Sequence, residues 1–251
     1  MKGLIPLLKK ELKQQLRTHR LLIVGSVFLC FGLMAPLLQY FMPEIIKMAN
    51  EQLIIELPPP TFLQSFTDYA GYFGQFGILI SVLVAMGAIA NEQKQGTALI
   101  TLSKPVSTGA FVNAKFIAMS LTFLAAQAVA AVFCFAYTTW LIGEAPLLPF
   151  IWMNVLMASF LIFCLAITLV FSSLFKSSLA AGGTAIGTIF GMGILSSLPV
   201  VGSYLPSKIL GWGINLLNVT GENYWGALTV TVVGIFLCLY FSQKILIRKE
   251  I

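Results

Sequence analysis

Six long apolar runs restrict this chain to a small set of folds. A helix that crosses about 30 Å of hydrocarbon needs roughly 20 apolar residues, and each run is near or above that length. None contains Asp, Glu, Lys, Arg or His, whereas a core helix of a soluble protein carries polar residues on one face. The sequence therefore predicts an all-α polytopic membrane protein, one domain over 1–251 with six transmembrane helices: Leu21–Phe41, Tyr72–Ala90, Phe116–Ile142, Ile151–Leu174, Leu179–Val201 and Trp225–Phe241.

The basic residues fall almost entirely on one side of these spans. Of the 15, only Lys47 and Lys208 lie on the opposite side. The others are Lys2, Lys9, Lys10, Lys13, Arg17, Arg20, Lys94, Lys104, Lys115, Lys176, Lys244, Arg248 and Lys249. Lys and Arg beside short loops stay cytoplasmic, so we expect a multi-pass protein of the cell membrane with both termini in the cytoplasm. The net charge of +6 then follows from topology and anionic lipids, which argues against nucleic acid as a partner.

The basic arm over 1–20 has the pattern of an amphipathic helix. Its apolar residues recur at helical spacing: Ile5, Leu8, Leu12 and Leu16. A basic stripe runs beside them: Lys9, Lys13 and Arg17. Such a helix lies in the membrane interface, with its apolar side toward the lipid chains and its basic side toward phosphates. The alternative is an arm that only sets the topology.

Two segments, 42–71 and 200–224, are predicted to lie outside the membrane on the far side. The first is acidic, has helical spacing over Glu44–Leu57 and then a stiff run of three prolines, 58–60. The second is apolar but interrupted by Pro and Gly, which excludes a seventh span. We expect it to be re-entrant or to lie on the surface, with its broken backbone buried in protein.

The cytoplasmic loop 92–107 is polar at first and then amphipathic. It predicts a turn near Gly96 followed by a short helix along the inner membrane surface. Pro105 ends that helix. Ser107 or Thr108 then caps the third span.

Several kinds of chemistry are missing from the sequence. It has no phosphate-binding loop, so we expect no ATP or other cofactor on this chain. Its one histidine, His19, lies in the arm, and its four cysteines lie inside spans without metal-ligand spacing, so no metal site is expected. The spans also lack the charged groups of an ion relay. The chain is therefore predicted to be a transport body without its own energy source and not an enzyme.

Two further features lie within the spans. Gly183, Gly187 and Gly191 form a small-residue face, which favours close helix packing over a hinge. Gln127 lies in mid-span, where its amide needs a partner or a wet cavity. Hydrogen bonding between helices is the simpler explanation, and a place on a translocation path is the functional one.

The cytoplasmic loop carries a recognisable motif. Glu92, the pair Gly96-Thr97, the run Leu102-Ser103-Lys104-Pro105-Val106-Ser107, and then Phe111 and Lys115 resemble the Glu-…-Gly-Thr-…-Leu-Ser-x-Pro-Val-Ser signature of bacterial ABC-2-type transporter permeases. Six spans, a basic arm and a broken segment before the last span are similar to that family over nearly the whole length. One departure is Thr108, where many relatives carry Arg.

The resemblance implies a permease subunit of an ATP-driven transporter, most simply an exporter. It implies a second copy or a similar permease as partner, and separate cytoplasmic ABC ATPase subunits that hold ATP and Mg. The ATPase-coupling residues would be Glu92, Gln93, Gly96, Thr97, Leu99, Leu102, Ser103, Lys104 and Pro105. A connecting helix beside them would use Leu8, Lys9, Leu12, Lys13, Leu16 and Arg17. The alternative is a receptor or immunity protein that binds a peptide or antibiotic without pumping it; an intramembrane enzyme lacks a nucleophile or metal cluster.

Overall fold

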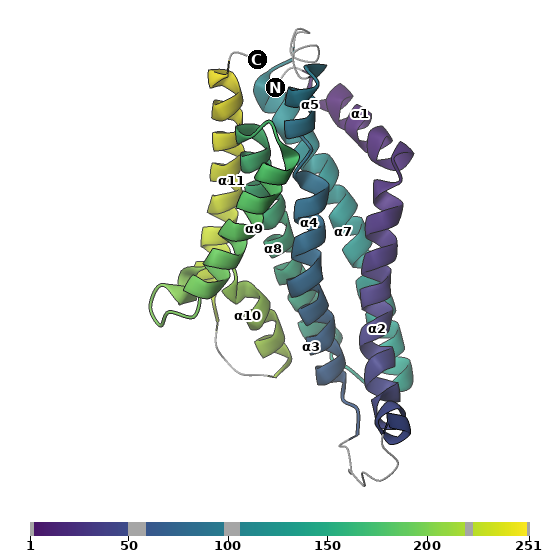
Figure 1. Cartoon of the computed structure of the whole chain (residues 1–251). Helices are drawn as coiled ribbons and strands as arrows, with labels where there is room; N and C mark the ends of the chain where they lie inside the picture. The colour runs from purple at the N-terminus through teal and green to yellow at the C-terminus, as the bar shows by residue number, and fades with distance from the viewer. Residues whose placement is uncertain (1–2, 50–58, 98–105, 219–222, 250–251) are drawn as a thin grey trace.

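The computed structural model describes residues 3–49, 59–97, 106–218 and 223–249, and within these residues the chain is helical and has no strand. The elements are α1 (Leu4–Arg17), α2 (Arg20–Ala49), α3 (Phe62–Tyr72), the π-helical η1 (Phe73–Gly77), α4 (Ile78–Ala85), α5 (Ala90–Lys94), α7 (Thr108–Leu141), α8 (Leu147–Leu174), α9 (Ser178–Leu195), the 3-10 turn η2 (Gly202–Tyr204), α10 (Lys208–Leu217) and α11 (Trp225–Arg248). Figure 1 shows an elongated bundle in which α1 is set at an angle to α2.

Within the residues that the structure describes, six helical stretches are long and apolar enough to cross a membrane, which confirms the predicted number of spans. They are Arg20–Met48, Phe62–Lys94, Thr108–Leu141, Leu147–Leu174, Ser178–Leu195 and Trp225–Arg248. The second is built from consecutive helical elements, α3, η1, α4 and α5. Helix α1 and the end of α11 lie at the same end of the bundle (Figure 1).

The first two spans are longer than their apolar cores predict. Helix α2 runs past Phe41 to Ala49. Helix α3 begins at Phe62, where Thr61 and Gln64 form a capping box. The external segment expected over 42–71 is therefore largely helical at both ends. Hydropathy underestimates these helices because they continue into polar residues beyond the hydrocarbon.

The separate outer helix expected over Glu44–Leu57 is not seen where the chain is described. Its first residues, 44–49, form the last turns of α2, and residues 50–58 lie outside the described residues. Of the three prolines, 58–60, only Pro59 and Pro60 are among the described residues.

The third span begins eight residues earlier than Phe116, and this changes the meaning of Lys115. Ser107 is the N-cap of α7, and its hydroxyl accepts a hydrogen bond from Ala110 N at 3.2 Å. Lys115 therefore lies inside a helix and is buried, with 3% of its surface exposed. Counting it as a loop charge was wrong, because a helix that starts at a polar cap carries its first turns outside the apolar core.

The segment 200–224 packs against the bundle where it is described. After η2, helix α10 lies along α8, with Ile209 and Trp212 buried between them and α11. The packing is made by α10, whereas Val200, Val201 and Tyr204 before it are exposed, so the expectation that the interrupted backbone is buried in protein holds only for the α10 part. The fifth span ends at Leu195 and not at Val201, and the last continues to Arg248.

Helix α8 is the centre of the bundle. It contacts α4, α7, α9, α10 and α11, and it is the most buried of the six spans. On the α2 side, Phe28 packs edge-on against Phe73 and Phe123, at 4.6 and 5.6 Å between ring centroids. Edge-to-face aromatic pairs add stability beyond the area they bury. This packing fixes α2, η1 and α7 to one another.

The glycine face of α9 has no partner among the described residues. A Cβ added at Gly183, Gly187 or Gly191 would meet nothing within 4 Å. The neighbouring Gly182 is the one that packs inside the chain, against Met86 of the second span. The small-residue face is therefore open to lipid or to another polypeptide.

Candidate functional site

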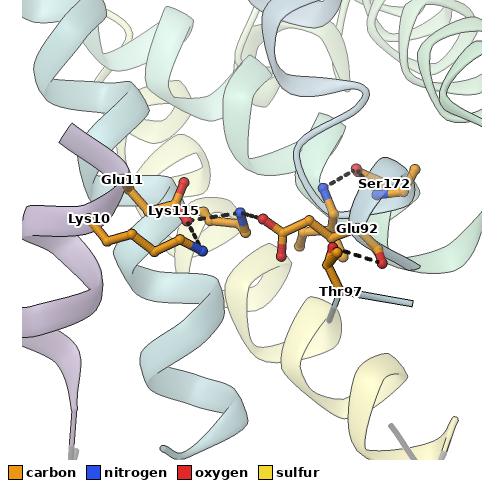
Figure 2. Close-up of polar contacts among 8 residues, drawn as sticks. Lys10, Glu11, Glu92, Thr97, Lys115 and Ser172 are labelled. Atoms are coloured by element: carbon orange, nitrogen blue, oxygen red, sulfur yellow. Dashed lines mark hydrogen bonds and ion pairs between the residues drawn. The ribbon is translucent and has the colours of Figure 1, made fainter. Parts of the chain in front are cut away.

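The second span breaks just before the loop 92–107, and Ser172 of α8 closes the break. Helix α4 ends at Ala85 and α5 begins at Ala90, so backbone groups between them lose their helical partners. The Ser172 hydroxyl accepts hydrogen bonds from Ile89 N and Ala90 N, both at 3.0 Å, and donates one to Met86 O at 2.8 Å. One side chain thus fixes the orientation of α5 on α8 (Figure 2).

Glu92, the acidic residue of the loop motif, points from α5 toward α1 and meets Lys115. Lys115 Nζ lies 2.6 Å from Glu92 Oε1 and 3.0 Å from Glu11 Oε1. Figure 2 shows the lysine of α7 between the two carboxylates. Its side chain is 4% exposed, against 11% for Glu11 and 16% for Glu92. The Glu11–Lys115–Glu92 triad therefore joins α1, α5 and α7 in a mostly buried setting.

The charge balance of this triad is incomplete. Two carboxylates face one buried ammonium, and Lys10, which is half exposed, lies 3.8 Å from Glu11. Glu92 Oε2 is buried and has no hydrogen-bond partner among the described residues. It borders a polar cavity of about 200 Å³ between α1, the second span and α7, to which Arg20 and Asn91 also contribute. A buried carboxylate oxygen without a donor is costly, so this junction is sensitive to any change in its contacts.

Gln93, the next residue of the motif, ties α5 to the ends of α8 and α11. Its Nε2 donates to Ser173 O at 2.9 Å. Lys249, just after α11, donates to Ser173 O and Leu174 O, both at 2.7 Å, and to Gln93 Oε1 at 3.2 Å. The last carbonyls of a helix lack intrahelical donors and carry its negative end, so a lysine is a suitable cap. Burial, and then the charge of Lys176, lower the pKa of Lys249.

Gly96 makes the turn that the sequence predicts. Its φ is +72°, in the left-handed region that favours glycine. Thr97 follows, and its hydroxyl reaches back to Glu92 O at 3.4 Å. The remaining predicted coupling residues, Leu99, Leu102, Ser103, Lys104 and Pro105, lie outside the described residues.

The arm is a helix as predicted, but its inner face is offset from the apolar stripe. Leu7, Glu11 and Gln15 are buried against the bundle, while Ile5 and Leu16 are exposed. Gln15 Oε1 accepts a hydrogen bond from Thr122 of α7. Of the predicted connecting residues, Leu8 and Leu12 are half-buried, and the basic ones are exposed: Lys9, Lys13 and Arg17. The polar inner face went unrecognised because Glu and Gln do not register as buried positions in a hydrophobic pattern.

The predicted residue Gln127 lies elsewhere, between α7 and α8 and deep in the span, where its Nε2 donates to Asn154 O at 2.9 Å. In the described part of the chain, no group of His, Cys, Asp and Glu could hold a metal ion.

The residues around α5 form a mechanical junction. Polar contacts connect this short helix to four others: α1 and α7 through Glu92 and Lys115, α8 through Ser172, and α11 through Gln93.

Comparison with known proteins agrees with the architecture and the loop motif. The sequence profile of the ABC-2 family transporter proteins matches residues 5–211. The chain belongs to this family, and it is accordingly a membrane-spanning permease component of an ABC transporter, not an enzyme in its own right. It is also 26% identical, over 96% of each chain, to YxlG, an uncharacterized transmembrane protein of Bacillus subtilis (strain 168).

Proposed function

We propose that this chain is the permease of an ATP-driven exporter and that the α5 junction couples it to a separate ABC ATPase. The observation that carries the proposal is the set of contacts around α5. A helix of five residues has little stability of its own, yet its polar contacts reach several helices of the bundle: α7 through Glu92, and α8 through Ser172 and Gln93. A force applied to the loop 92–107 is therefore transmitted to α1, α7, α8 and α11 together.

In this proposal the ATPase binds on the side where α1 and α5 meet, and it holds ATP and Mg. The exposed basic stripe of α1 contacts the ATPase or anionic lipid headgroups, and exposed Ile5 and Leu16 enter the membrane interface. Closure of two ATPase subunits displaces the loop, and the junction tilts the second and third spans. Substrate leaves outward between two permease copies, or between this chain and a similar permease.

The test is dependence on the ATPase. The chain is expressed with and without an ABC ATPase from the same genome, and each preparation is reconstituted in liposomes. We expect the ATPase to co-purify with the tagged chain, and the chain alone neither to hydrolyse ATP nor to move cargo uphill. Gly96→Leu, which strains a left-handed turn by about 1–2 kcal/mol, should reduce co-purification. Uphill transport by the chain alone on a proton or sodium gradient would contradict the proposal, and ligand binding without any ATPase effect would favour a receptor.

The proposed orientation predicts labelling from opposite sides. In a cysteine-free background, Glu144→Cys on the α7–α8 connection should react with an impermeant maleimide added to intact cells. Lys176→Cys on the α8–α9 connection should react only after the cells are opened. Both positions precede or follow long helices, so the change leaves the spans intact. Labelling of the two sites from the same side would exclude the six-span topology with cytoplasmic termini.

The open glycine face of α9 predicts a contact between permease copies. Gly187→Leu should weaken the dimer, because a side chain would separate helices that approach through their backbones, at a cost of about 1–3 kcal/mol. The measurement is the dimer fraction in detergent by light scattering. Thr188→Leu, at an exposed position of the same helix that is turned about 100° away from Gly187, is the control. If Gly187→Leu leaves the dimer fraction unchanged, the glycine face contacts lipid.

A further inference from the structure

A groove of about 550 Å³ opens between α7 and α8, in the half of the bundle away from α1 and the end of α11. Its walls are apolar, from Leu124, Ala128 and Val132 on α7 and Ile151 and Val155 on α8. Val132 is 67% exposed and Val155 is 49% exposed, so the groove opens outward from the bundle. Because α7 and α8 cross the membrane at this level, the opening faces hydrocarbon and not water. Its size is in the range of small-molecule sites.

Three polar residues from three elements form a hydrogen-bond network beside this groove. The Tyr69 hydroxyl of α3 donates to Asn154 Oδ1 at 3.0 Å. Asn154 Nδ2 donates to Phe150 O at 3.0 Å, and Gln127 Nε2 donates to Asn154 O at 2.9 Å. All three residues thus use a donor within the network. Gln127 and Asn154 also line the groove.

One acceptor of this network, the side-chain oxygen of Gln127, has no hydrogen bond. Gln127 is 3% exposed, and its Oε1 has no hydrogen-bond partner among the residues that the structure describes. In water such an oxygen would be solvated, but in hydrocarbon no solvent donor is available. Buried polar groups in native proteins are almost always satisfied by protein, water or ligand. Gln127 is one of the residues that line the groove, so a donor on a molecule bound there would supply the partner that this buried oxygen lacks.

We propose that the groove binds a single-chain amphiphile whose hydroxyl or amide N–H donates to Gln127 Oε1, while its alkyl chain lies against the alanine and valine side chains. The apolar walls of the groove indicate that the ligand has an alkyl chain. The unpartnered Gln127 Oε1 indicates that the ligand also carries a hydrogen-bond donor. A carboxylate would place an acceptor against an acceptor, and no cationic residue lines the groove to compensate it. A quaternary ammonium has no donor to offer, and an ordinary lipid tail would leave the oxygen unsatisfied.

Binding here does not depend on the ATPase. Only the identification of the ligand as cargo rests on the proposed function. If the ligand is cargo, the position of the groove away from α1 and the loop 92–107 places it in the outer half of the membrane, next to the proposed exit. The purified chain alone is sufficient to test binding, so failure of this inference and failure of the ATPase dependence give different results.

The experiment compares two probes that share a chain and differ in one donor. Tritiated dodecanol is bound to the chain in lipid nanodiscs by scintillation proximity, with empty nanodiscs as background, and competed with dodecanol or its methyl ether. We expect saturable binding and about tenfold weaker competition by the ether, a difference of about 1.4 kcal/mol and within the range of one hydrogen bond. Gln127→Leu should remove this preference and leave binding of the ether unchanged.

A pair of bulky substitutions locates the site independently of Gln127. Ala128 lines the groove, whereas the adjacent Val129 is 48% exposed and lies outside its lining. Ala128→Phe should abolish saturable binding of dodecanol, and Val129→Phe should not. Three results would each overturn the proposal: no saturable binding to the wild-type chain, equal competition by alcohol and ether, or unchanged binding after Ala128→Phe. A change of oligomeric state on Ala128→Phe would instead identify the groove as an interface between copies.

Discussion

Lys115→Met is expected to uncouple the permease from its ATPase and to destabilise it strongly. The substitution removes the ammonium that lies 3.0 Å from Glu11 and 2.6 Å from Glu92 and leaves two buried carboxylates facing each other. Breaking a buried pair by removing one partner costs about 3–5 kcal/mol. The contact of Lys115 Nζ with the Phe111 ring, at 5.1 Å from its centroid, is lost as well. We expect a marked fall in the melting temperature and little co-purified ATPase.

Lys10→Met is the matched control for this change. Lys10 also lies near Glu11, at 3.8 Å, but its side chain is 49% exposed. Exposed ion pairs are screened by solvent and contribute little to stability. Lys10→Met should therefore leave both the melting temperature and ATPase binding close to wild type. Equal effects of the two substitutions would mean that the triad has no special role.

A neutral triad separates stability from coupling. In the variant Glu11→Gln, Glu92→Gln, Lys115→Met no uncompensated charge remains buried, so much of the lost stability should return. The side chains at positions 11 and 92 would nevertheless no longer be joined through a lysine at position 115. Helix α5 would therefore move more freely relative to α1. We expect co-purification and stimulation of the ATPase to stay low in this variant. Full recovery of ATPase co-purification and ATPase stimulation would mean that the triad contributes only to stability.

Much of this fold could be predicted from the sequence because hydropathy reports directly on burial in lipid. The six spans and the helical arm came from runs of apolar residues and from spacing. The turn at Gly96 could be predicted because glycine adopts a positive φ far more readily than other residues do. The exact span ends were less predictable. A span such as α7 extends into polar residues, where its end depends on a cap and not on hydrophobicity.

The partners of the site could not be read from the sequence. Lys115 and Glu11 are 104 positions apart, and Gln93 and Lys249 are 156 apart. No local pattern encodes which charges meet across a bundle. Lys115 did stand in the family-like motif, but as a charge at a span boundary it had no assigned role. Ser172 gave no signal at all, since most Ser and Thr hydroxyls in membrane helices bond their own backbone.

Ser172→Ala is expected to be far more harmful than the same change at its neighbour. Without the hydroxyl, Ile89 N, Ala90 N and Met86 O lose their partner at the break between α4 and α5. Each buried polar group left unsatisfied costs about 1–3 kcal/mol, although partial refolding of the break will recover some of this. We expect a large drop in melting temperature, or a second span that no longer holds α5 against α8. Hydrogen exchange at the amides of residues 89 and 90 should rise accordingly.

Ser173→Ala provides the comparison because the two serines are adjacent and equally buried, both with 0% of their surface exposed. The Ser173 hydroxyl bonds only Val170 O of its own helix, at 2.7 Å, in the described structure. Its backbone oxygen, which Gln93 and Lys249 use, is unchanged by the substitution. Ser173→Ala should therefore shift the melting temperature slightly and leave exchange at residues 89 and 90 as in wild type. Similar exchange in the two variants would show that the break is held by packing and not by the Ser172 hydroxyl, and α8 would then not position the loop through this contact.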